Sequence, residues 1–562
     1  MSIEELNHLS SHQGSTEFSL LEETIGQALE RISTQHPDNL ALVVRHQEVS
    51  YSYKEFNHQV DKLAKGLLAL GINSGDRVGI WAPNCVEWVL TQYATAKIGA
   101  VMTCINPAYR VHELEYALNK VECRAIITAE NFKSSKYLDM LQTLAPELNE
   151  FSPQQQVKLK KLPYLECIIR LGDEATNGMF NFNSVLNMAK NIDDNLLQTV
   201  GAKLSNTDAI NIQFTSGTTG KPKGATLTHR NILNNANFTA KNMLFTENDK
   251  LCIPVPMYHC FGMVLGTLVC MTSGATAVLP AESFEPLTTL QAVADERCTA
   301  LHGVPTMFIA EMEHEDFSQF DLSSLRTGIM AGSPCPIEVM KSVIDKMHMH
   351  QVLIVYGQTE LSPMSHMTLP DDPIDKRVST VGKPASHCEV KLVDEDNNIV
   401  PIGQKGEICT RGYSVMLGYW NDEERTVDTI DVDGFLHSGD LGIMDEEGYV
   451  QVVGRLKDMI IRGGENIYPR EIEEFLYTIE QVQDVQVFGI PHEKLGEQVV
   501  AWISLKEDGS ITENEIKAIC KENIAHFKVP SIIKFVKDYP MTVTGKIQKF
   551  KMRDMMVEEL AT

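Results

Sequence analysis

The chain has 562 residues, of which 43% are hydrophobic, so it is long enough to bury several cores without disulfide bonds. This composition excludes a disulfide-stabilised miniprotein, a disordered chain and a collagen-like fibre. Its 49 basic and 75 acidic residues give a formal net charge of −26, which repels nucleic acid and anionic lipid. We therefore expect no nucleic-acid partner, and an anionic substrate must be bound by a local group of donors and cations.

The cysteines and the first residues of the chain indicate in which cellular compartment the protein works. The 12 cysteines lie between Cys85 and Cys520, and no two of them form a C-x-x-C pair, so neither a zinc site nor a disulfide framework is indicated. The first basic residue is Arg31, which several glutamates precede. The chain therefore starts without the pattern of a signal or transit peptide. We expect a cytoplasmic protein.

The first half of the sequence alternates short apolar runs with helical patterns. Strands are predicted at residues 77–82, 99–103, 275–279, 299–302, 327–331 and 351–355, and helices at 87–98 and 110–121. Strands that alternate with helices are typical of parallel sheets. This part of the chain is therefore predicted to be an α/β domain.

One stretch within this region could be mistaken for a membrane span. Residues 251–281 contain no Asp, Glu, Lys or Arg, and a bilayer needs about 20 apolar residues. However, Pro254, Pro256, Gly262 and Gly266 interrupt any helix of that length, and no basic anchors flank the stretch. We predict a buried strand and helix and no transmembrane segment, and peripheral contact with a membrane is left open.

The pattern changes after about residue 379. Short strands with close turns at 389–393, 407–410 and 449–453 predict an antiparallel β subdomain. From residue 454 onward the remaining chain suits one small α+β domain, with strands at 485–490 and 499–503. Residues 526–553 contain seven basic side chains against Asp538 alone. This run either brings positive charge to an anionic substrate or is an ordinary solvated face.

A loop rich in Gly, Thr and Lys is the sharpest local signal. Residues 215–224 read TSGTTGKPKG, follow the alternating strand that contains Ile212, and precede a helical stretch predicted to begin near Thr228. Hydroxyls, unobstructed backbone N–H groups and two lysines suit a polyphosphate. The loop lacks the Walker A spacing, and no G-x-G dinucleotide fingerprint occurs in the chain. The alternative is a flexible surface loop.

This loop resembles the phosphate-binding signature of the adenylate-forming superfamily, which includes acyl-CoA synthetases, adenylation domains of peptide synthetases and firefly luciferases. Five further motifs follow in the order typical of that superfamily: YGQTE at 356–360, SGD at 438–440, GRLKD at 454–458, GGENI at 463–467 and GK at 545–546. The resemblance spans roughly residues 25 to 555. Segments 412–420, 458–469 and 545–551 most resemble the acyl-CoA synthetase family member 2 group of medium-chain fatty acid ligases.

The resemblance implies a large N-terminal domain, residues 1–456, and a small mobile C-terminal cap, residues 457–562, with Lys457 as the hinge. It implies two reactions. A carboxylate attacks the α-phosphorus of ATP to give acyl-AMP and pyrophosphate, and the thiol of CoA then displaces AMP. The implied ligands are a fatty acid, ATP, CoA and Mg²⁺, for which Glu360 would supply a hard oxygen.

The same resemblance assigns roles to individual residues. The nucleotide would be bound by Thr215, Ser216, Gly217, Thr218, Thr219, Gly220, Lys221, Lys223, Gly332, Ser333, Pro334, Tyr356, Gly357, Gln358, Thr359, Asp440 and Arg455. Within this set Asp440 would bind the ribose, although an ordinary turn residue is the alternative. The catalytic set would be Lys546, Thr359, Glu360 and His259, and the CoA set Gly463, Gly464 and Glu465.

The acyl pocket is the site that the sequence defines least. The resemblance implies Trp81, His259, Gly303, Val304, Thr306, Gly328 and Gly332, because glycines without side chains leave room for an alkyl tail. Glycines on strands are otherwise packing positions, and a lone histidine in an apolar stretch is usually a core residue. We expect a medium-chain fatty acid–CoA ligase. The alternatives are an aryl or short-chain acid ligase and a non-enzymatic, membrane-associated fatty-acid-binding protein, and association of copies is left open.

Overall fold

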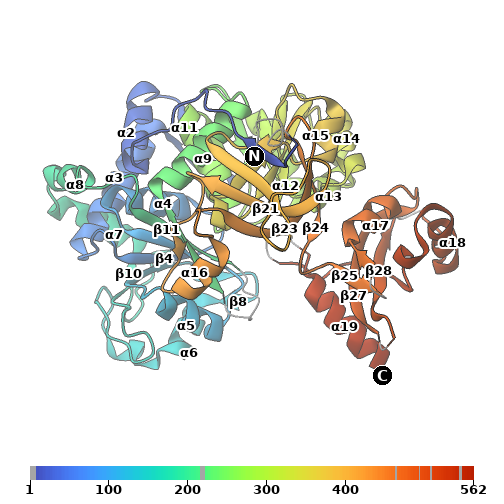
Figure 1. Ribbon diagram of the computed structural model, residues 1–562. Coiled ribbons are helices and arrows are strands. Elements are labelled where there is room, and N and C mark those ends of the chain that lie inside the picture. The colour runs from blue at the N-terminus through green and yellow to red at the C-terminus, as the bar shows by residue number, and fades with distance from the viewer. Residues whose placement is uncertain are drawn as a thin grey trace.

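The computed structural model describes residues 8–215, 222–333, 335–462, 465–492, 494–506, 509–542 and 547–561. Two large sheets of mainly parallel strands and one antiparallel sheet form the N-terminal body, and a smaller sheet organises the C-terminal part. In Figure 1 this C-terminal part, in orange to red, stands to one side of the larger body. The fold class predicted from the sequence is confirmed.

The first large sheet has eight strands. Its order is β10 (Phe180–Asn181), β9 (Cys167–Arg170), β6 (Ala125–Thr128), β4 (Arg77–Trp81), β5 (Val101–Cys104), β11 (Ala209–Thr215), β12 (Lys223–Thr228) and β22 (Gly418–Tyr419). The strands from β10 to β11 are parallel, whereas β12 and β22 are antiparallel to their neighbours. The antiparallel pair brings the chain back beside β11, at the site described below.

The second large sheet has nine strands. Its order is β19 (Lys383–Pro384), β18 (Met364–Met367), β17 (Gln351–Gly357), β16 (Thr327–Ala331), β15 (Ala300–Leu301), β13 (Lys250–Cys252), β14 (Thr276–Leu279), β2 (Leu40–Val44) and β3 (Val49–Ser52). Its centre is parallel, and antiparallel strands close both edges. Side chains buried on both faces explain why these strands read as continuous apolar runs.

The remaining sheets follow the predicted change of pattern. An antiparallel sheet comprises β1 (Ser11–Gln13), β20 (Cys388–Val393), β21 (Lys405–Gly412), β23 (Leu436–Met444) and β24 (Val450–Arg455). The C-terminal sheet comprises β26 (Glu465–Ile467), β25 (Ile460–Arg462), β28 (Gly496–Leu505), β27 (Val482–His492) and β29 (Ile532–Phe535). A short pair, β7 (Asn131–Phe132) and β8 (Ser135–Lys136), lies apart from these sheets.

Helices cover the sheets. Those of the N-terminal body are α2 (Ile25–Gln35), α3 (Tyr53–Ala69), α4 (Val86–Ile98), α5 (Val111–Lys120), α6 (Tyr137–Leu144), α7 (Phe182–Met188), α8 (Asp194–Gly201), α9 (His229–Asn242), α10 (Cys260–Gly262), α11 (Val269–Ser273), α12 (Pro286–Glu296), α13 (Pro305–Met312), α14 (Ile337–Lys346), α15 (Ile374–Ser379) and α16 (Glu423–Thr429). The C-terminal helices are α17 (Pro469–Leu476), α18 (Glu513–Asn523) and α19 (Lys549–Ala561).

The uncharged stretch 251–281 is part of the core. It forms the end of β13, α10, a π-helical segment at Met263–Leu268, α11 and β14, and nearly all of its residues are buried. Among the described residues no helix is long and apolar enough to span a bilayer. The prediction of a buried strand and helix is confirmed.

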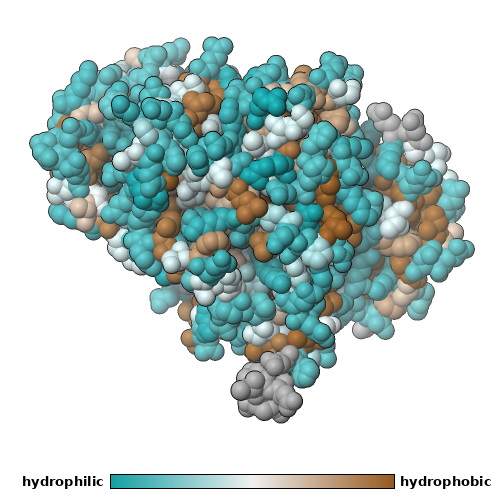
Figure 2. Space-filling model, turned by 90° about the horizontal axis from the view of Figure 1, so that it is seen from above, coloured by the Kyte–Doolittle hydropathy of each residue, from teal (hydrophilic) through white to brown (hydrophobic). Residues whose placement is uncertain are grey.

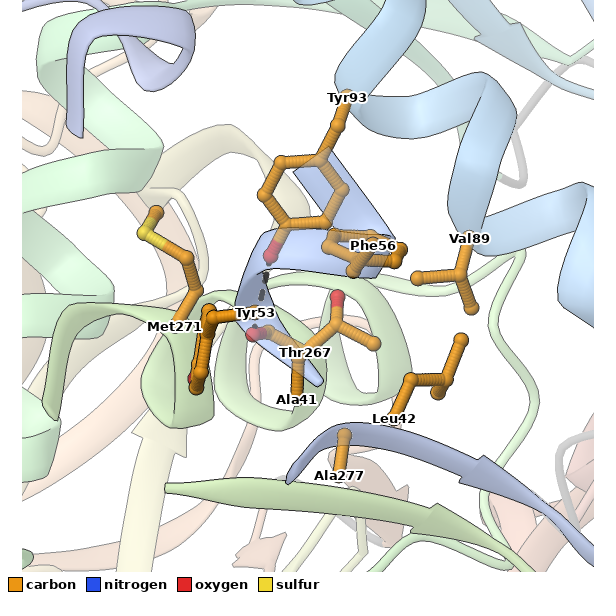
Figure 3. A pocket seen from close by; sticks show the side chains of 9 residues that line it. All are labelled: Ala41, Leu42, Tyr53, Phe56, Val89, Tyr93, Thr267, Met271 and Ala277. Atoms are coloured by element: carbon orange, nitrogen blue, oxygen red, sulfur yellow. Dashed lines mark hydrogen bonds between the residues drawn. The ribbon is translucent and has the colours of Figure 1, made fainter. Parts of the chain in front are cut away.

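A small cavity lies inside this core (Figure 3). Tyr53, Phe56, Tyr93 and Met271 are among its lining residues, and its volume is about 10 Å³. The hydroxyl of Tyr93 donates to the carbonyl of Thr267 at 3.1 Å. A space of this size holds about one water molecule, so it cannot accommodate an acyl chain. The face seen in Figure 2 is mostly hydrophilic with scattered hydrophobic patches, as the acidic composition leads us to expect.

One buried carboxyl group has no counterpart in the sequence predictions. Glu311, in α13, is 1% exposed, and neither of its carboxyl oxygens has a hydrogen-bond partner among the described residues. Burial raises its pKa well above the ordinary value of 4.5. In the unfolded chain this group ionises above about pH 4.5, so stability falls with rising pH by up to about 1.4 kcal/mol per unit until the folded-state pKa is reached.

We expect Glu311→Met to raise the melting temperature, and to raise it more at pH 8 than at pH 4.5, because the substitution removes the buried carboxyl group. Thermal unfolding at the two pH values measures this difference. Glu315→Met, at an exposed position shortly after α13, is the matched control and should change neither value. An equal effect of Glu311→Met at both pH values would contradict the linkage.

Candidate functional site

The carboxyl end of β17 carries the first group of site residues. Tyr356 and Gly357 end this strand, and Gln358 precedes the short 3₁₀ helix Thr359–Leu361. At Gly357 a Cβ atom would lie 1.8 Å from the carbonyl oxygen of Pro363, so only glycine fits this backbone approach. The YGQTE motif is therefore held against the following chain at the edge of the sheet.

Asp440, on β23, lies opposite this strand end. The residue is 5% exposed, and its carboxylate accepts hydrogen bonds from the Tyr356 hydroxyl at 2.8 Å and from Nε of Arg455 at 2.6 Å. The Asp440 charge raises the pKa of Arg455, and burial together with this carboxylate raises the pKa of Tyr356. Three residues from separate predicted motifs thus form one hydrogen-bonded group.

A cavity of about 460 Å³ opens beside this group. From the N-terminal body it is lined by Gly332, Ser333, Tyr356, Gly357, Asp440 and Arg455. From the C-terminal part it is lined by residues of α17, β27 and α19 and by Thr542 and Ile547. Its volume suits a small-molecule ligand, and it lies between two parts of the chain, where ligand sites are common.

The second group of site residues surrounds Glu360. This residue is 7% exposed, and its Oε1 accepts hydrogen bonds from the hydroxyls of Tyr419 at 2.8 Å and Thr215 at 3.2 Å. Nζ of Lys223 donates to the Tyr419 hydroxyl at 2.6 Å and lies 4.0 Å from Oε1 of Glu360. Burial lowers the pKa of Lys223, and Glu360 opposes that shift. The arrangement offers a hard oxygen ligand and a cation side by side.

Tyr419 was not predicted as a site residue. It lies on β22, whose pairing with β12 brings it beside Lys223, and the lysine nitrogen also lies 4.1 Å from the Tyr419 ring centroid. Segment 412–420 indicated a family resemblance, but its sequence does not show which of its side chains faces Glu360. Only the antiparallel addition of β22 to the large sheet supplies that information.

A strand that the sequence did not predict precedes the predicted helix. Residues Lys223–Thr228 form β12, which pairs antiparallel with β11 and was not predicted. Helix α9 then begins at His229, so the predicted helix start near Thr228 is confirmed, and Thr228 caps the helix by accepting the N–H of Asn231. Strands β11 and β12 therefore form an antiparallel pair, and both faces of β12 are buried.

His259 lies at the start of α10. Its Nδ1 accepts the backbone N–H of Phe261 at 3.1 Å, so a neutral ring carries its proton on Nε2. Cys260, the next residue, hydrogen-bonds to Gln213 at 3.1 Å and also interacts with the side chain of Thr359. Cys260 therefore connects the segment that holds His259 to the YGQTE turn.

The residues predicted for the acyl pocket do not all line one cavity. Thr306 and Gly332 line the 460 Å³ cavity beside Tyr356. Trp81 is fully buried on β4, where its ring stacks on Tyr137 at 3.7 Å and Nε1 donates to the carbonyl of Asn106. Val304 precedes α13 and is 6% exposed.

Two glycines of that set, Gly328 on β16 and Gly303 shortly after β15, are tightly packed. A Cβ on Gly303 would lie 2.9 Å from the ring of Phe308, and one on Gly328 would lie 1.9 Å from the carbonyl oxygen of Leu301. At Gly328 the neighbouring backbone already fills the space, so the absence of a side chain there serves strand packing.

Several predicted residues lie outside the described part of the chain. These are Ser216, Gly217, Thr218, Thr219, Gly220, Lys221, Pro334, Gly463, Gly464 and Lys546. Glu465 is described: it is exposed at the start of β26 and does not belong to the lining of the 460 Å³ cavity. Lys457 is exposed in the turn between β24 and β25, where the N–H of Asp458 donates to the carbonyl of Arg455.

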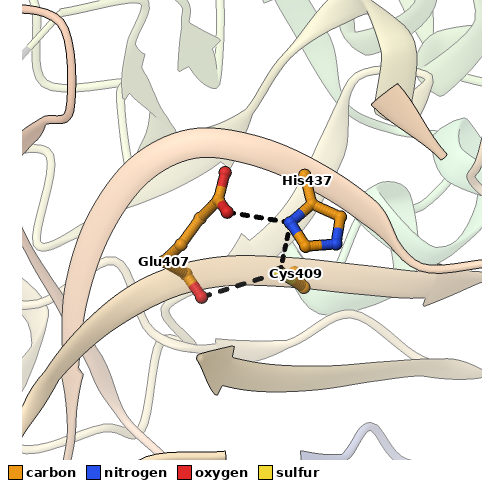
Figure 4. A group of neighbouring side chains, drawn as sticks. All are labelled: Glu407, Cys409 and His437. Carbon is orange, nitrogen blue, oxygen red and sulfur yellow. Dashed lines mark hydrogen bonds and ion pairs between the residues drawn. The ribbon is translucent and has the colours of Figure 1, made fainter. Parts of the chain in front are cut away.

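Among the described residues, one group could offer mixed ligand atoms to a metal. Glu407, Cys409 and His437 present a carboxylate oxygen, a sulfur and a ring nitrogen within 4.8 Å of one another (Figure 4). However, Nδ1 of His437 already lies 2.8 Å from Oε2 of Glu407 and 3.4 Å from the Cys409 sulfur. The nitrogen that a metal would need is engaged in hydrogen bonds.

Comparison with known proteins decides the family. A family model described as AMP-binding enzyme matches residues 29–420, and one described as AMP-binding enzyme C-terminal domain matches residues 471–546. The chain belongs to the AMP-binding enzyme family. The resemblance to adenylate-forming enzymes found in the sequence motifs is thereby confirmed.

Relatives cover nearly the whole of this AMP-binding enzyme. The putative acyl-CoA synthetase YngI of Bacillus subtilis is 48% identical over 540 residues, which are 96% of this chain and 98% of the relative. The mitochondrial medium-chain acyl-CoA ligase ACSF2 of Danio rerio is 45% identical over 98% of this chain and 90% of the relative. Among solved structures, the anthranilate CoA ligase AuaEII in complex with anthranoyl-AMP has a TM-score of 0.85 at 26% identity, over 96% of this chain and 99% of that one.

Proposed function

We propose that this enzyme is a medium-chain fatty acid–CoA ligase that works through an acyl-adenylate. The coarser activity, ATP-dependent joining of an acid to CoA with release of AMP, follows from the family and from relatives that align over almost the entire chain. The acyl chain length rests on the ACSF2 ligases, which are named for medium-chain acids and are 41–45% identical in the sequences compared.

One observation carries the nucleotide part of the proposal. Tyr356, Asp440 and Arg455 border the same cavity as Thr542 and Ile547, which flank the GK motif of the C-terminal domain. We propose that the Tyr356 face contacts adenine, that Asp440 binds the ribose and that Arg455 orients the Asp440 carboxylate through their hydrogen bond. Gly332, Ser333 and Pro334 complete the adenine side, and Gly357 and Gln358 complete the turn.

The phosphate part of the proposal rests on the group around Glu360. Residues 215–223 would bind the β- and γ-phosphates, and Thr359 would donate to the α-phosphate. Mg²⁺ needs only one or two protein carboxylates when phosphate oxygens supply further ligands, and the buried Glu360 beside two hydroxyls fits that requirement. When bound, the metal would neutralise charge on the departing pyrophosphate. Tyr419 would orient Glu360 and Lys223 toward the same phosphates.

The remaining roles concern the acid and CoA. His259, with Nδ1 engaged by Phe261, would offer an Nε2–H donor to the acyl carboxylate. Trp81, Gly303, Val304 and Thr306 would border the acyl chain, whereas the packing at Gly328 favours a structural role there. Gly463, Gly464 and Glu465 would face CoA after the C-terminal domain, residues 457–562, turns about Lys457.

The cellular setting is inferred from cysteine chemistry. All 12 cysteines are free thiols, and all are buried. A chain with this many unpaired cysteines fits a reducing compartment, so we propose the cytoplasm. Peripheral membrane contact and association of copies stay predictions.

An acid series tests the chain length. We expect kcat/KM to rise about fourfold for each methylene from butanoate to about octanoate, because burying a CH₂ contributes about 0.8 kcal/mol, and to rise no further once the pocket is full. ATP–pyrophosphate exchange and CoA-dependent AMP release would be measured for each acid. Preference for benzoate or anthranilate would favour the aryl ligase, and preference for acetate the short-chain ligase. Either result would refute the medium-chain assignment.

A further inference from the structure

Glu407, Cys409 and His437 form a cluster on two adjacent strands (Figure 4). Glu407 and Cys409 are two residues apart on β21 and share one face of the strand, and Cys409 pairs directly across from His437 on β23. Oε2 of Glu407 lies 2.8 Å from Nδ1 of His437. Because strands rather than a loop hold both residues, their spacing is fixed by the sheet.

Charged groups surround the imidazole ring. Glu407 faces Nδ1, and Oδ2 of Asp431 lies 3.6 Å from Nε2. Lys391, on β20, lies 3.5 Å from the same Asp431 oxygen, and the Cys409 thiol is the remaining neighbour on β21. The hydrogen bond and the charge of Glu407 raise the pKa of His437. A protonated ring can therefore bridge the two carboxylates.

The other oxygen of Glu407 contacts the nucleotide turn. Its Oε1 accepts the backbone N–H of Gly439 at 2.8 Å. Gly439 has φ of +72°, a conformation that favours glycine, and Asp440 follows it directly. The carbonyl of Gly439 in turn accepts the N–H of Leu456 at 2.9 Å, one residue before Lys457. Gly439 thus connects the Glu407 carboxylate, the Asp440 backbone and the start of the C-terminal domain.

We propose that Glu407, held in place by His437, is a positioning residue that fixes the Gly439–Asp440 turn and so aims the Asp440 carboxylate at the nucleotide ribose. The proposal rests on the proposed role of Asp440 in ribose binding. Both carboxylate oxygens of Glu407 are used, one by the ring and one by the turn, so a shift of either partner moves the other. Neither residue touches the nucleotide, because they act through the backbone of Gly439.

The experiment compares binding of ATP and of 2′,3′-dideoxy-ATP by calorimetry. A hydrogen bond to a charged group contributes enough to give the wild type a preference for ATP of roughly 10- to 150-fold. In Glu407→Ala we expect this preference to fall to within about threefold of unity, while affinity for the dideoxy nucleotide stays unchanged. A residue that merely stabilised the fold would weaken both nucleotides equally.

Two further variants separate the roles within the cluster. Glu407→Gln keeps an acceptor for the Gly439 N–H and should restore most of the ATP preference. Cys409→Ala is the matched control. It removes a thiol that touches His437 but keeps the hydrogen bond from the Gly439 N–H to Glu407, so its preference for ATP should match that of the wild type. Thermal unfolding of each variant checks that the fold is intact.

The pH dependence gives an independent readout. As pH rises through the raised pKa of His437, the ring loses its charge and holds Glu407 less firmly, so the wild-type preference for ATP should decline. In His437→Asn, whose amide nitrogen can donate near the position of Nδ1 without titrating, the preference should not vary over the same range.

Outcomes that overturn the proposal are equal losses for both nucleotides in Glu407→Ala, failure of Glu407→Gln to recover the preference, or the same pH profile in His437→Asn as in the wild type. Because binding of the two nucleotides is measured without an acid or CoA, a wrong acyl substrate leaves this test intact. A wild type that binds both nucleotides equally would refute the ribose role of Asp440 and the proposal together.

Discussion

Lys546→Ala should slow acyl-AMP formation from ATP by about 10²- to 10³-fold, the cost of removing one preorganised donor from a developing charge. Negative charge redistributes at the α-phosphate as pyrophosphate leaves, and the ammonium group of Lys546 would stabilise it. Lys546 itself lies outside the described residues, but Thr542 and Ile547 on either side line the cavity that holds Tyr356 and Asp440. Pyrophosphate release in a single turnover measures the first reaction.

The second reaction should survive in this variant. When acyl-AMP and CoA are supplied, we expect thioester formation at close to the wild-type rate, because a turned C-terminal domain would carry Lys546 away. Lys551→Ala, an exposed lysine of the same basic run on α19, is the matched control and should change neither reaction. Normal adenylation in Lys546→Ala, or equal loss of both reactions in a folded protein, would contradict the assignment.

Much of the fold could be predicted because strand periodicity and burial are local properties. Strands β4, β5, β16 and β17 and the antiparallel β20 and β21 lie where the apolar runs predicted them. The strand β12 was missed, since its short alternation directly after a Gly-rich loop also suits the approach to a helix. The buried Glu311 was missed as well, because a helical glutamate reads as solvent-exposed until the neighbouring elements are placed.

The candidate site could be predicted only in part. Ordered motifs identify which side chains bear the chemistry, and the structure brings Tyr356, Asp440 and Arg455 into hydrogen-bond contact. Contacts that depend on how two strands are paired could not be predicted. Tyr419 meets Glu360 only because β22 joins the sheet beside β12, and Glu407 meets Gly439 only because of a register shift between β21 and β23. Such shifts leave no pattern in the letters of a single sequence.

The packing at Gly328 shows the same limit for the acyl pocket. Absence of a side chain has two uses, to leave space for a ligand and to allow close approach of a strand, and the sequence cannot separate them. A Cβ atom on Gly328 would lie 1.9 Å from the carbonyl oxygen of Leu301, and this distance decides in favour of close approach. Chain length therefore has to be measured with the acid series rather than derived from glycine positions.

Lys457→Pro should leave acyl-AMP formation measurable and reduce thioester formation by at least about tenfold. Lys457 occupies the turn between β24 and β25, in which the N–H of Asp458 donates to the carbonyl of Arg455 at 3.1 Å. Proline fixes φ near −65° and restricts the preceding residue, so it removes the freedom through which the C-terminal domain would turn between the two reactions. Domain rotations of this kind commonly limit turnover.

The two half-reactions of this variant are measured separately, by pyrophosphate release from ATP and by conversion of supplied acyl-AMP and CoA. Lys457→Ala is the matched control: it removes the same side chain but keeps a flexible backbone, so both rates should stay within about threefold of the wild type. If the alanine variant lost thioester formation as fully as the proline variant, the lysine side chain would be responsible. Equal loss of both reactions in Lys457→Pro would instead indicate damage to the turn that supports Arg455 and Asp440, and either result would refute the hinge.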